Sequence, residues 1–131
     1  MERFQLDVRA LILKNDEVLF LMNSKTSEWD LPGGLLNMSE LPDNAILREI
    51  NAQTSLEVEN LALVSDTIYE RDSVPTLGLF YLIDYKEGNV DISDEFSKYI
   101  WVKLSEVKDQ KLPLWIHDHL LEILKKYQTP Q

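Results

Sequence analysis

The chain has 131 residues, 44% of them apolar, which is enough for one compact domain over residues 1–131. It has no cysteine, so disulfide frameworks and thiolate sites are excluded, and it shows neither an apolar run long enough for a membrane span nor a basic leader. From these absences we expect a cytoplasmic protein without a membrane partner. The 23 acidic and 13 basic residues give a net charge of −10, which repels the phosphates of a nucleic-acid backbone, so we expect no nucleic-acid partner.

The N-terminal part of the chain predicts a β-hairpin followed by a short extended segment. Apolar residues alternate with a period of two from Phe4 to Leu13, and Asn15-Asp16 predicts a turn into the apolar run Val18–Met22. A polar loop then leads to Trp29–Leu31, which is extended because Pro32 disfavours helix at the preceding residue.

A helix is predicted from about Leu41 to Thr54, with Ser39 as its N-cap and Pro42 in its first turn. Its inward stripe has apolar residues at helical spacing: Leu41, Ala45, Ile46 and Ile50.

The second half of the chain is rich in strand-forming residues and ends in an amphipathic helix. The helix is expected from about Leu114 to Tyr127, after a brief helical turn at Ser105–Val107. The strands are expected at Leu61–Val64, Thr67–Tyr69, Leu77–Tyr85 and Lys98–Val102.

Residues 29–56, WDLPGGLLNMSELPDNAILREINAQTSL, carry the most informative motif. Gly33-Gly34 permits a tight turn and a close backbone approach to a ligand. Glu40 follows six positions after Gly34, and Arg48-Glu49-Ile50 begins eight positions after Glu40. This spacing resembles the signature of the Nudix family of diphosphate hydrolases, in which a glycine, five residues, a glutamate and seven residues precede Arg-Glu-aliphatic-x-Glu-Glu-x-Gly-aliphatic.

The chain departs from this signature at three positions. Ala52 and Gln53 stand where the family has its Glu-Glu pair, and Ser55 replaces the late glycine. Positions 49, 52 and 53 share one helix face, so a face that would carry three carboxylates keeps only Glu49. Serine at 55 conflicts with a left-handed helix end, so we expect that end to be altered or strained.

The resemblance implies an α+β Nudix fold, an α/β/α sandwich with a mixed β-sheet. The sheet is flanked by the helix predicted over residues 41–54, here called the box helix, and by a C-terminal helix. It also implies hydrolysis of a nucleoside diphosphate linked to another group, with Mg²⁺ or Mn²⁺ neutralising the phosphates. The substrate is thus expected to be a small nucleotide-type diphosphate. A homodimer is compatible with this assignment, because dimers are common among similar proteins.

The resemblance further assigns roles to individual residues. Gly33 and Gly34 would contact the substrate, while the Gly34 carbonyl, Glu49, Gln53 and Glu95 would hold the metal. Glu49 and Glu95 would be the catalytic carboxylates. The alternative is that neither residue takes part in chemistry: Glu49 would then be a solvated residue of the helix, and Glu95 would belong to a hydrated acidic loop.

Glu40 and Arg48 are expected to form an ion pair that ties the loop to the helix, rather than to take part in chemistry. If the chain is a Nudix hydrolase, we expect hydrolysis to be weak or metal-impaired, because the two glutamates at positions 52 and 53 are missing. A second reading is an inactive Nudix domain that binds a nucleotide or a protein partner. A third is an unrelated α+β interaction domain, which a fold without a Gly33-Gly34 loop leading into the helix would favour.

Overall fold

The predicted N-terminal hairpin forms the centre of the sheet. In the computed structural model, which describes residues 3–128, β1 (Gln5–Lys14) and β2 (Glu17–Asn23) pair antiparallel around Asn15-Asp16. The described residues form a seven-stranded mixed sheet in the order β3-β2-β1-β6-β5, with β4 paired to β1 and β7 paired to β2. The other strands are β3 (Trp29–Asp30), β4 (Gly33–Leu35), β5 (Glu57–Arg71), β6 (Val74–Glu87) and β7 (Phe96–Lys103).

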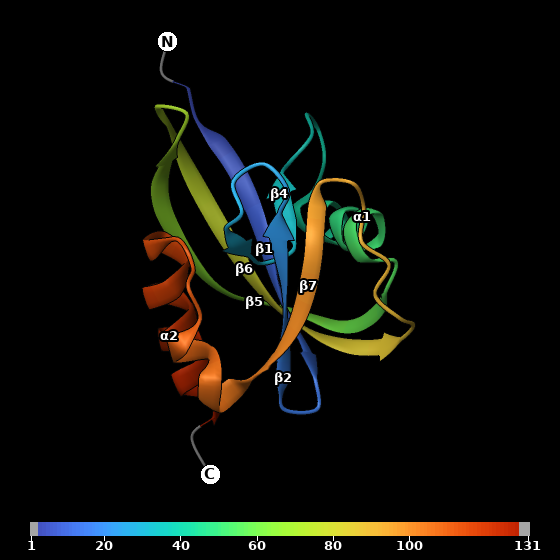
Figure 1. Cartoon of the computed structure of the whole chain (residues 1–131). Helices are drawn as coiled ribbons and strands as arrows, with labels where there is room; N and C mark the ends of the chain where they lie inside the picture. The colour runs from blue at the N-terminus through green and yellow to red at the C-terminus, as the bar shows by residue number, and fades with distance from the viewer. Residues whose placement is uncertain (1–2, 129–131) are drawn as a thin grey trace.

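Alternation along β1 builds a separate apolar core on each face of the sheet. Val8, Ala10 and Ile12 pack with α1 (Pro42–Thr54), whereas Leu11 packs with α2 (Leu114–Gln128). The two helices therefore lie on opposite sides of the strands (Figure 1). This arrangement confirms the predicted α+β sandwich. In the described part of the chain, neither helix has the length and apolarity needed to cross a membrane.

The box helix begins within one residue of its predicted start, but its cap differs from the prediction. Its N-cap is Leu41, which makes no side-chain capping bond, and Pro42 is the first helical residue. The expected N-cap, Ser39, is wrong because Ser39 has a φ of 66° and belongs to the preceding turn. At the other end, Ser55 has φ 62° and ψ 12°, so the left-handed ending is kept with a serine in it.

Two other expectations change in the structure. The strands expected at Leu61–Val64 and Thr67–Tyr69 are one strand, β5, because the intervening Ser65 and Asp66 pair with Phe80 and Leu79 of β6. Gly33 is not a tight turn but extended chain paired with Arg9, and its φ of 151° belongs to the region that favours glycine. The brief helical turn is the 3-10 helix η1 (Leu104–Asp109).

Candidate functional site

Glu49 lies on α1 directly beside the extended segment that contains Gly34. Its Oε2 atom is 2.6 Å from the place where a Cβ of residue 34 would be, so only glycine leaves room for the carboxylate as it stands. Glu49 is partly buried, and Arg48 donates a hydrogen bond from Nη1 to its Oε1. Burial raises the pKa of Glu49, and the charge of Glu95 adds to this increase, while Arg48 opposes it.

Gln53, one helical turn after Glu49, joins the helix to Gly33. Its Oε1 accepts the backbone N–H of Gly33 at 3.0 Å, and its Nε2 donates to the Gly33 carbonyl at 2.7 Å. The same Nε2 donates to Glu49 Oε2 at 2.7 Å, and the residue is only 2% exposed. The carbonyl to which Gln53 donates thus belongs to Gly33, one residue before the carbonyl that the family resemblance implies as a metal ligand.

Arg48 links the loop before α1 to Glu49. Its Nε donates to Glu40 Oε2 at 2.7 Å and its Nη2 donates to Glu40 Oε1 at 2.9 Å, which is a bidentate ion pair. Glu40 also accepts the backbone N–H of Asn37 at 2.9 Å, and Arg48 Nη2 lies 3.4 Å from the Leu35 carbonyl. These bonds place the guanidinium so that it orients Glu49.

The other two expected positions contribute less to this cluster. Ala52 is exposed and has no donor atom, and Glu95 is exposed in the turn before β7. Glu95 is close enough to raise the pKa of Glu49 by its charge. Among the residues that the structure describes, no three histidine or acidic side chains gather into a group that could hold a metal ion.

A buried polar network behind Gly33 was not expected from the sequence. Arg9 donates to Asp7 Oδ2 at 3.0 Å, to Asp30 Oδ2 at 3.2 Å and to the Leu31 carbonyl at 3.2 Å. Tyr69 donates to Asp7 Oδ2 at 2.6 Å, and Asp7 is fully buried. The network holds the segment before Gly33 against β1. Its sequence signal is the presence of two charged residues, Asp7 and Arg9, in an otherwise apolar strand.

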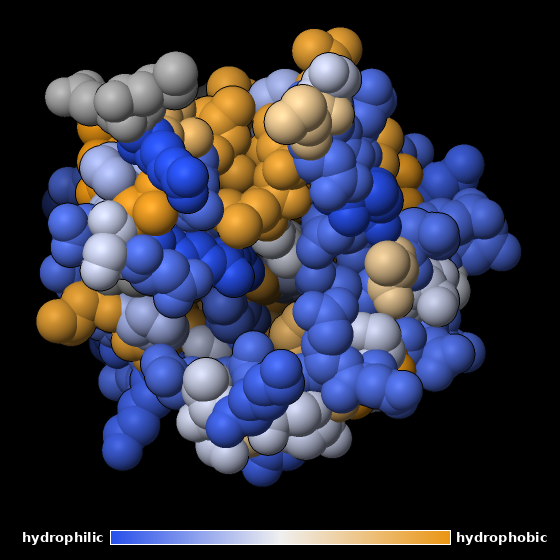
Figure 2. Space-filling model, turned by 90° about the horizontal axis from the view of Figure 1, so that it is seen from above, coloured by the Kyte–Doolittle hydropathy of each residue, from blue (hydrophilic) through white to orange (hydrophobic). Residues whose placement is uncertain are grey.

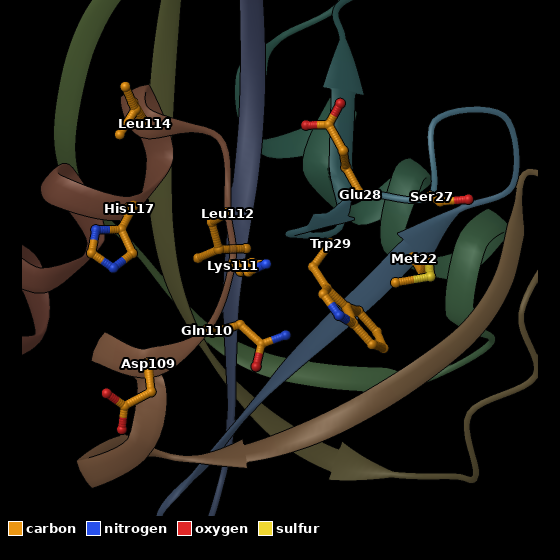
Figure 3. A pocket seen from close by; sticks show the side chains of 10 residues that line it. All are labelled: Met22, Ser27, Glu28, Trp29, Asp109, Gln110, Lys111, Leu112, Leu114 and His117. Atoms are coloured by element: carbon orange, nitrogen blue, oxygen red, sulfur yellow. The ribbon is translucent and has the colours of Figure 1, made fainter.

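A cleft of about 780 Å³ opens between the strands β2 and β3 and the segment that joins η1 to α2. Figure 3 shows Met22 and Trp29 on the strand side and Gln110 and His117 on the side of α2. The amine of Lys98 lies 5.7 Å from the centroid of the Trp29 ring. An aromatic ring with a cation nearby suits a planar base attached to an anionic group.

A smaller groove of about 420 Å³ lies next to the loop before α1. It is lined by Phe4, Leu36, Met38 and Glu40, among others, and the Met38 side chain is 97% exposed. Viewed from above, the surface is largely hydrophilic but includes an apolar area (Figure 2).

Comparison with known proteins places this geometry in a family. A family model of the NUDIX domain matches residues 3–123. The chain belongs to the Nudix family. A MutT-like protein of Streptomyces ambofaciens is 24% identical over 104 residues, which are 79% of this chain and 66% of that protein. An RNA pyrophosphohydrolase of Pseudomonas fluorescens is 34% identical over 60 residues, which are 44% of this chain and 38% of that protein.

The chain spans less than two thirds of the length of these two relatives. Its fold is similar to the crystal structure of a MutT protein from Methanosarcina mazei Go1, with a TM-score of 0.85 and 23% sequence identity. That similarity covers 98% of each chain and shows the shared fold. The loop from Gly33 to Glu40 and α1 are accordingly the Nudix box of this protein.

Nudix proteins generally use divalent metal ions, and the box residues of this chain do not fit a cluster of such ions. Mg²⁺ and Mn²⁺ prefer hard oxygen ligands, and each Mg²⁺ ion usually takes one or two carboxylates together with water and substrate phosphate, so a cluster of ions needs several carboxylates. Ala52 offers none, and the Gln53 oxygen already accepts the Gly33 N–H while its NH₂ group faces Glu49. Glu49 is therefore the one carboxylate among positions 49, 52 and 53, which share one face of this helix.

Proposed function

We propose that this chain, a single Nudix domain over residues 1–131, binds a nucleoside diphosphate linked to another group and hydrolyses it slowly. The observation that carries the proposal is the position of Glu49, which is half-buried beside Gly34 and oriented by Arg48. An oriented carboxylate next to a glycine segment is suited to act on a phosphoanhydride brought close to the backbone.

The diphosphate is proposed to lie along Gly33 and Gly34, with Glu49 as the main catalytic carboxylate and Glu95 as the second. The net charge of −10 means that an anionic substrate needs a counter-ion. Mg²⁺ or Mn²⁺ is the proposed ion. It would arrive bound to the diphosphate, and only then would it have to compete with the Gln53 amide for Glu49 and the backbone carbonyl. This competition and the missing acids are the physical reason for expecting slow turnover.

The nucleoside is proposed to lie in the cleft at Trp29. This residue is four positions before Gly33, so the cleft and the box are joined by one short segment. Trp29 offers a face for stacking, and Lys98 offers a positive charge near it. One relative is an RNA pyrophosphohydrolase, a name that denotes the cleavage of a pyrophosphate bond.

The second candidate is a Nudix domain that binds a nucleotide or a protein partner without hydrolysing anything. The observation that favours it is the buried Gln53 amide, which occupies the place where the family resemblance puts a metal-binding glutamate. The exposed apolar groove at Phe4 and Met38 would be available to a protein partner.

A turnover screen tests the first candidate. Nucleotides, nucleotide sugars and dinucleotide polyphosphates are incubated with Mg²⁺ or Mn²⁺ and the wild-type protein, and released phosphate or nucleotide is measured. Slow turnover of at least one class is expected, with a loss of about 100-fold or more in Glu49→Gln. The matched control is Glu57→Gln, which removes an exposed glutamate outside the box and should leave turnover unchanged.

Calorimetric titration of the same compounds separates the two candidates. Binding without turnover, together with new turnover in an Ala52→Glu/Gln53→Glu variant, would favour the non-hydrolytic candidate. If the wild-type protein neither binds nor cleaves any of these compounds, the nucleoside diphosphate proposal is wrong.

A further inference from the structure

The side-chain amide of Gln53 makes three hydrogen bonds at the junction between the Gly33 segment and α1. Its oxygen accepts the Gly33 N–H at 3.0 Å, and its nitrogen lies 2.7 Å from both the Gly33 carbonyl oxygen and Glu49 Oε2. At 2% exposure the amide is out of reach of bulk water. All the hydrogen-bonding groups of this side chain are thus engaged with the box.

The orientation of this amide is fixed by its surroundings. An amide carries two N–H donors on nitrogen and only acceptor capacity on oxygen. Rotating it by half a turn would place its oxygen against the Gly33 carbonyl and the Glu49 carboxylate, and its NH₂ group against the Gly33 N–H. Such an arrangement has acceptor facing acceptor and donor facing donor, so the observed orientation is strongly preferred.

The same two oxygens, from Gly33 and Glu49, are what a divalent cation at this junction would need. Two oxygens that both carry negative charge density do not approach one another without something positive between them. Here the two amide hydrogens of Gln53 provide that positive charge density, with one N–H directed to each oxygen. The junction is therefore closed by the protein's own atoms.

We propose that Gln53 replaces a bridging cation in this protein: its NH₂ group holds Glu49 to the Gly33 carbonyl, so that the junction is assembled without a divalent metal ion. The inference rests on the proposed function only in taking this junction as the diphosphate site. It also means that the identity of residue 53 decides whether the junction needs a divalent ion.

The Gln53→Glu change should reverse the metal requirement of the junction. A carboxylate at position 53 has no N–H to donate, so it would face the Gly33 carbonyl and Glu49 with like charge density. That repulsion is relieved when a cation binds between the oxygens. The variant should consequently bind a hard divalent ion that the wild-type junction does not.

The experiment measures Mn²⁺ binding and thermal unfolding of the full chain in the absence of any nucleotide. Wild-type protein should have the same melting temperature in EDTA and in Mn²⁺. The Gln53→Glu variant should melt lower in EDTA, recover by several degrees in Mn²⁺, and bind Mn²⁺ at least about tenfold more tightly than wild type by calorimetry. Asn51→Glu is the matched control, because it adds the same charge at an exposed position of α1 and should gain no Mn²⁺ affinity.

A second measurement on the wild-type protein keeps the test decisive if Gln53→Glu does not fold. The side-chain NH₂ signals of Gln53 are followed by NMR during titration with excess Mg²⁺, and they should not move. Displacement of these signals by Mg²⁺, or Mn²⁺ affinity of the wild type equal to that of Gln53→Glu, would overturn the inference. Because no substrate is present, either result is distinguishable from failure of the proposed function.

Discussion

Alanine substitutions at the two adjacent box glycines should have very different effects. At Gly33 an added Cβ would lie 1.9 Å from the Val8 carbonyl oxygen, whereas ordinary contact begins near 3.4 Å. The obstacle is backbone of the paired strand β1, which no side-chain rotation can remove. The φ of 151° is a further penalty for any residue with a Cβ.

The magnitude follows from these two effects. Positive-φ strain costs about 1–3 kcal/mol and overpacking costs a further 1–3 kcal/mol, and the backbone contact places Gly33→Ala near the upper end, at about 4–6 kcal/mol. A domain of this size has about 5–15 kcal/mol in total. The melting temperature of Gly33→Ala should thus fall by more than about 10 °C.

Gly34→Ala should instead leave the fold intact and move Glu49. Its added Cβ would be 2.6 Å from Glu49 Oε2, so the carboxylate must retreat by about 0.8 Å to reach the ordinary 3.4 Å. Because the end of a flexible side chain can shift, the free energy of unfolding should fall by about 1 kcal/mol or less. The NH₂ signals of Gln53, which donates to that oxygen, should shift in the NMR spectrum.

Urea denaturation and NMR of both variants check this contrast. If Gly33→Ala is within about 1 kcal/mol of wild type, the close approach of Gly33 to β1 is not as described. If Gly34→Ala is as destabilising as Gly33→Ala, the neighbour of Gly34 is not a movable carboxylate.

Ser55→Gly is expected to raise the free energy of unfolding by about 1 kcal/mol, because serine at φ 62° is strained and glycine is not, whereas Ser97→Gly on exposed strand β7 should lower it. Urea denaturation compares the two, and equal effects would contradict the strain. Tyr69→Phe should cost about 1.5–3 kcal/mol in the same assay, because the lost hydroxyl donates to the buried carboxylate of Asp7 at 2.6 Å; a loss below about 0.5 kcal/mol would argue against that bond. Hydrogen bonds donated by Arg48 lower the pKa of Glu40 from 4.5 to about 2. The stability gained from this pair is therefore full above pH 4.5 and is lost as the pH falls toward 2, so the stability difference between wild type and Glu40→Gln should shrink over that interval, and a constant difference would refute the assignment.

Local patterns account for the parts of the fold that were predictable. Asn15 tolerates the φ of 58° that the hairpin turn requires, and Pro42 marks the first turn of α1 because its missing N–H is no loss there. Such signals act between residues that are close in sequence. They place the hairpin and the box helix within a residue or two of their observed bounds.

The role of Gln53 could not be read from the sequence, because its partner Gly33 is twenty residues away. From the sequence, its amide oxygen is a free, uncharged ligand for a metal. Once β4 lies beside α1, that oxygen is used by a backbone N–H and the nitrogen faces the carboxylate. Which atom of an amide faces a site is decided by packing, which composition and spacing do not specify.

The polar network behind Gly33 was unpredictable for a similar reason. Asp7 and Tyr69 are 62 residues apart, and they meet because β6 pairs in parallel with β1 and antiparallel with β5. A parallel pair requires a long connection, and the sequence does not specify which strand it reaches. The charged residues in β1 were visible, but their partners were not.

The alternation along β1 makes the length of this strand critical. Even-numbered residues such as Val8 and Ala10 face α1, and Leu11 faces α2. One inserted residue would invert this parity downstream and exchange the contents of the two cores. The exposed loop at 24–28 has no such constraint, so length variation among natural relatives is expected there and not within residues 5–14.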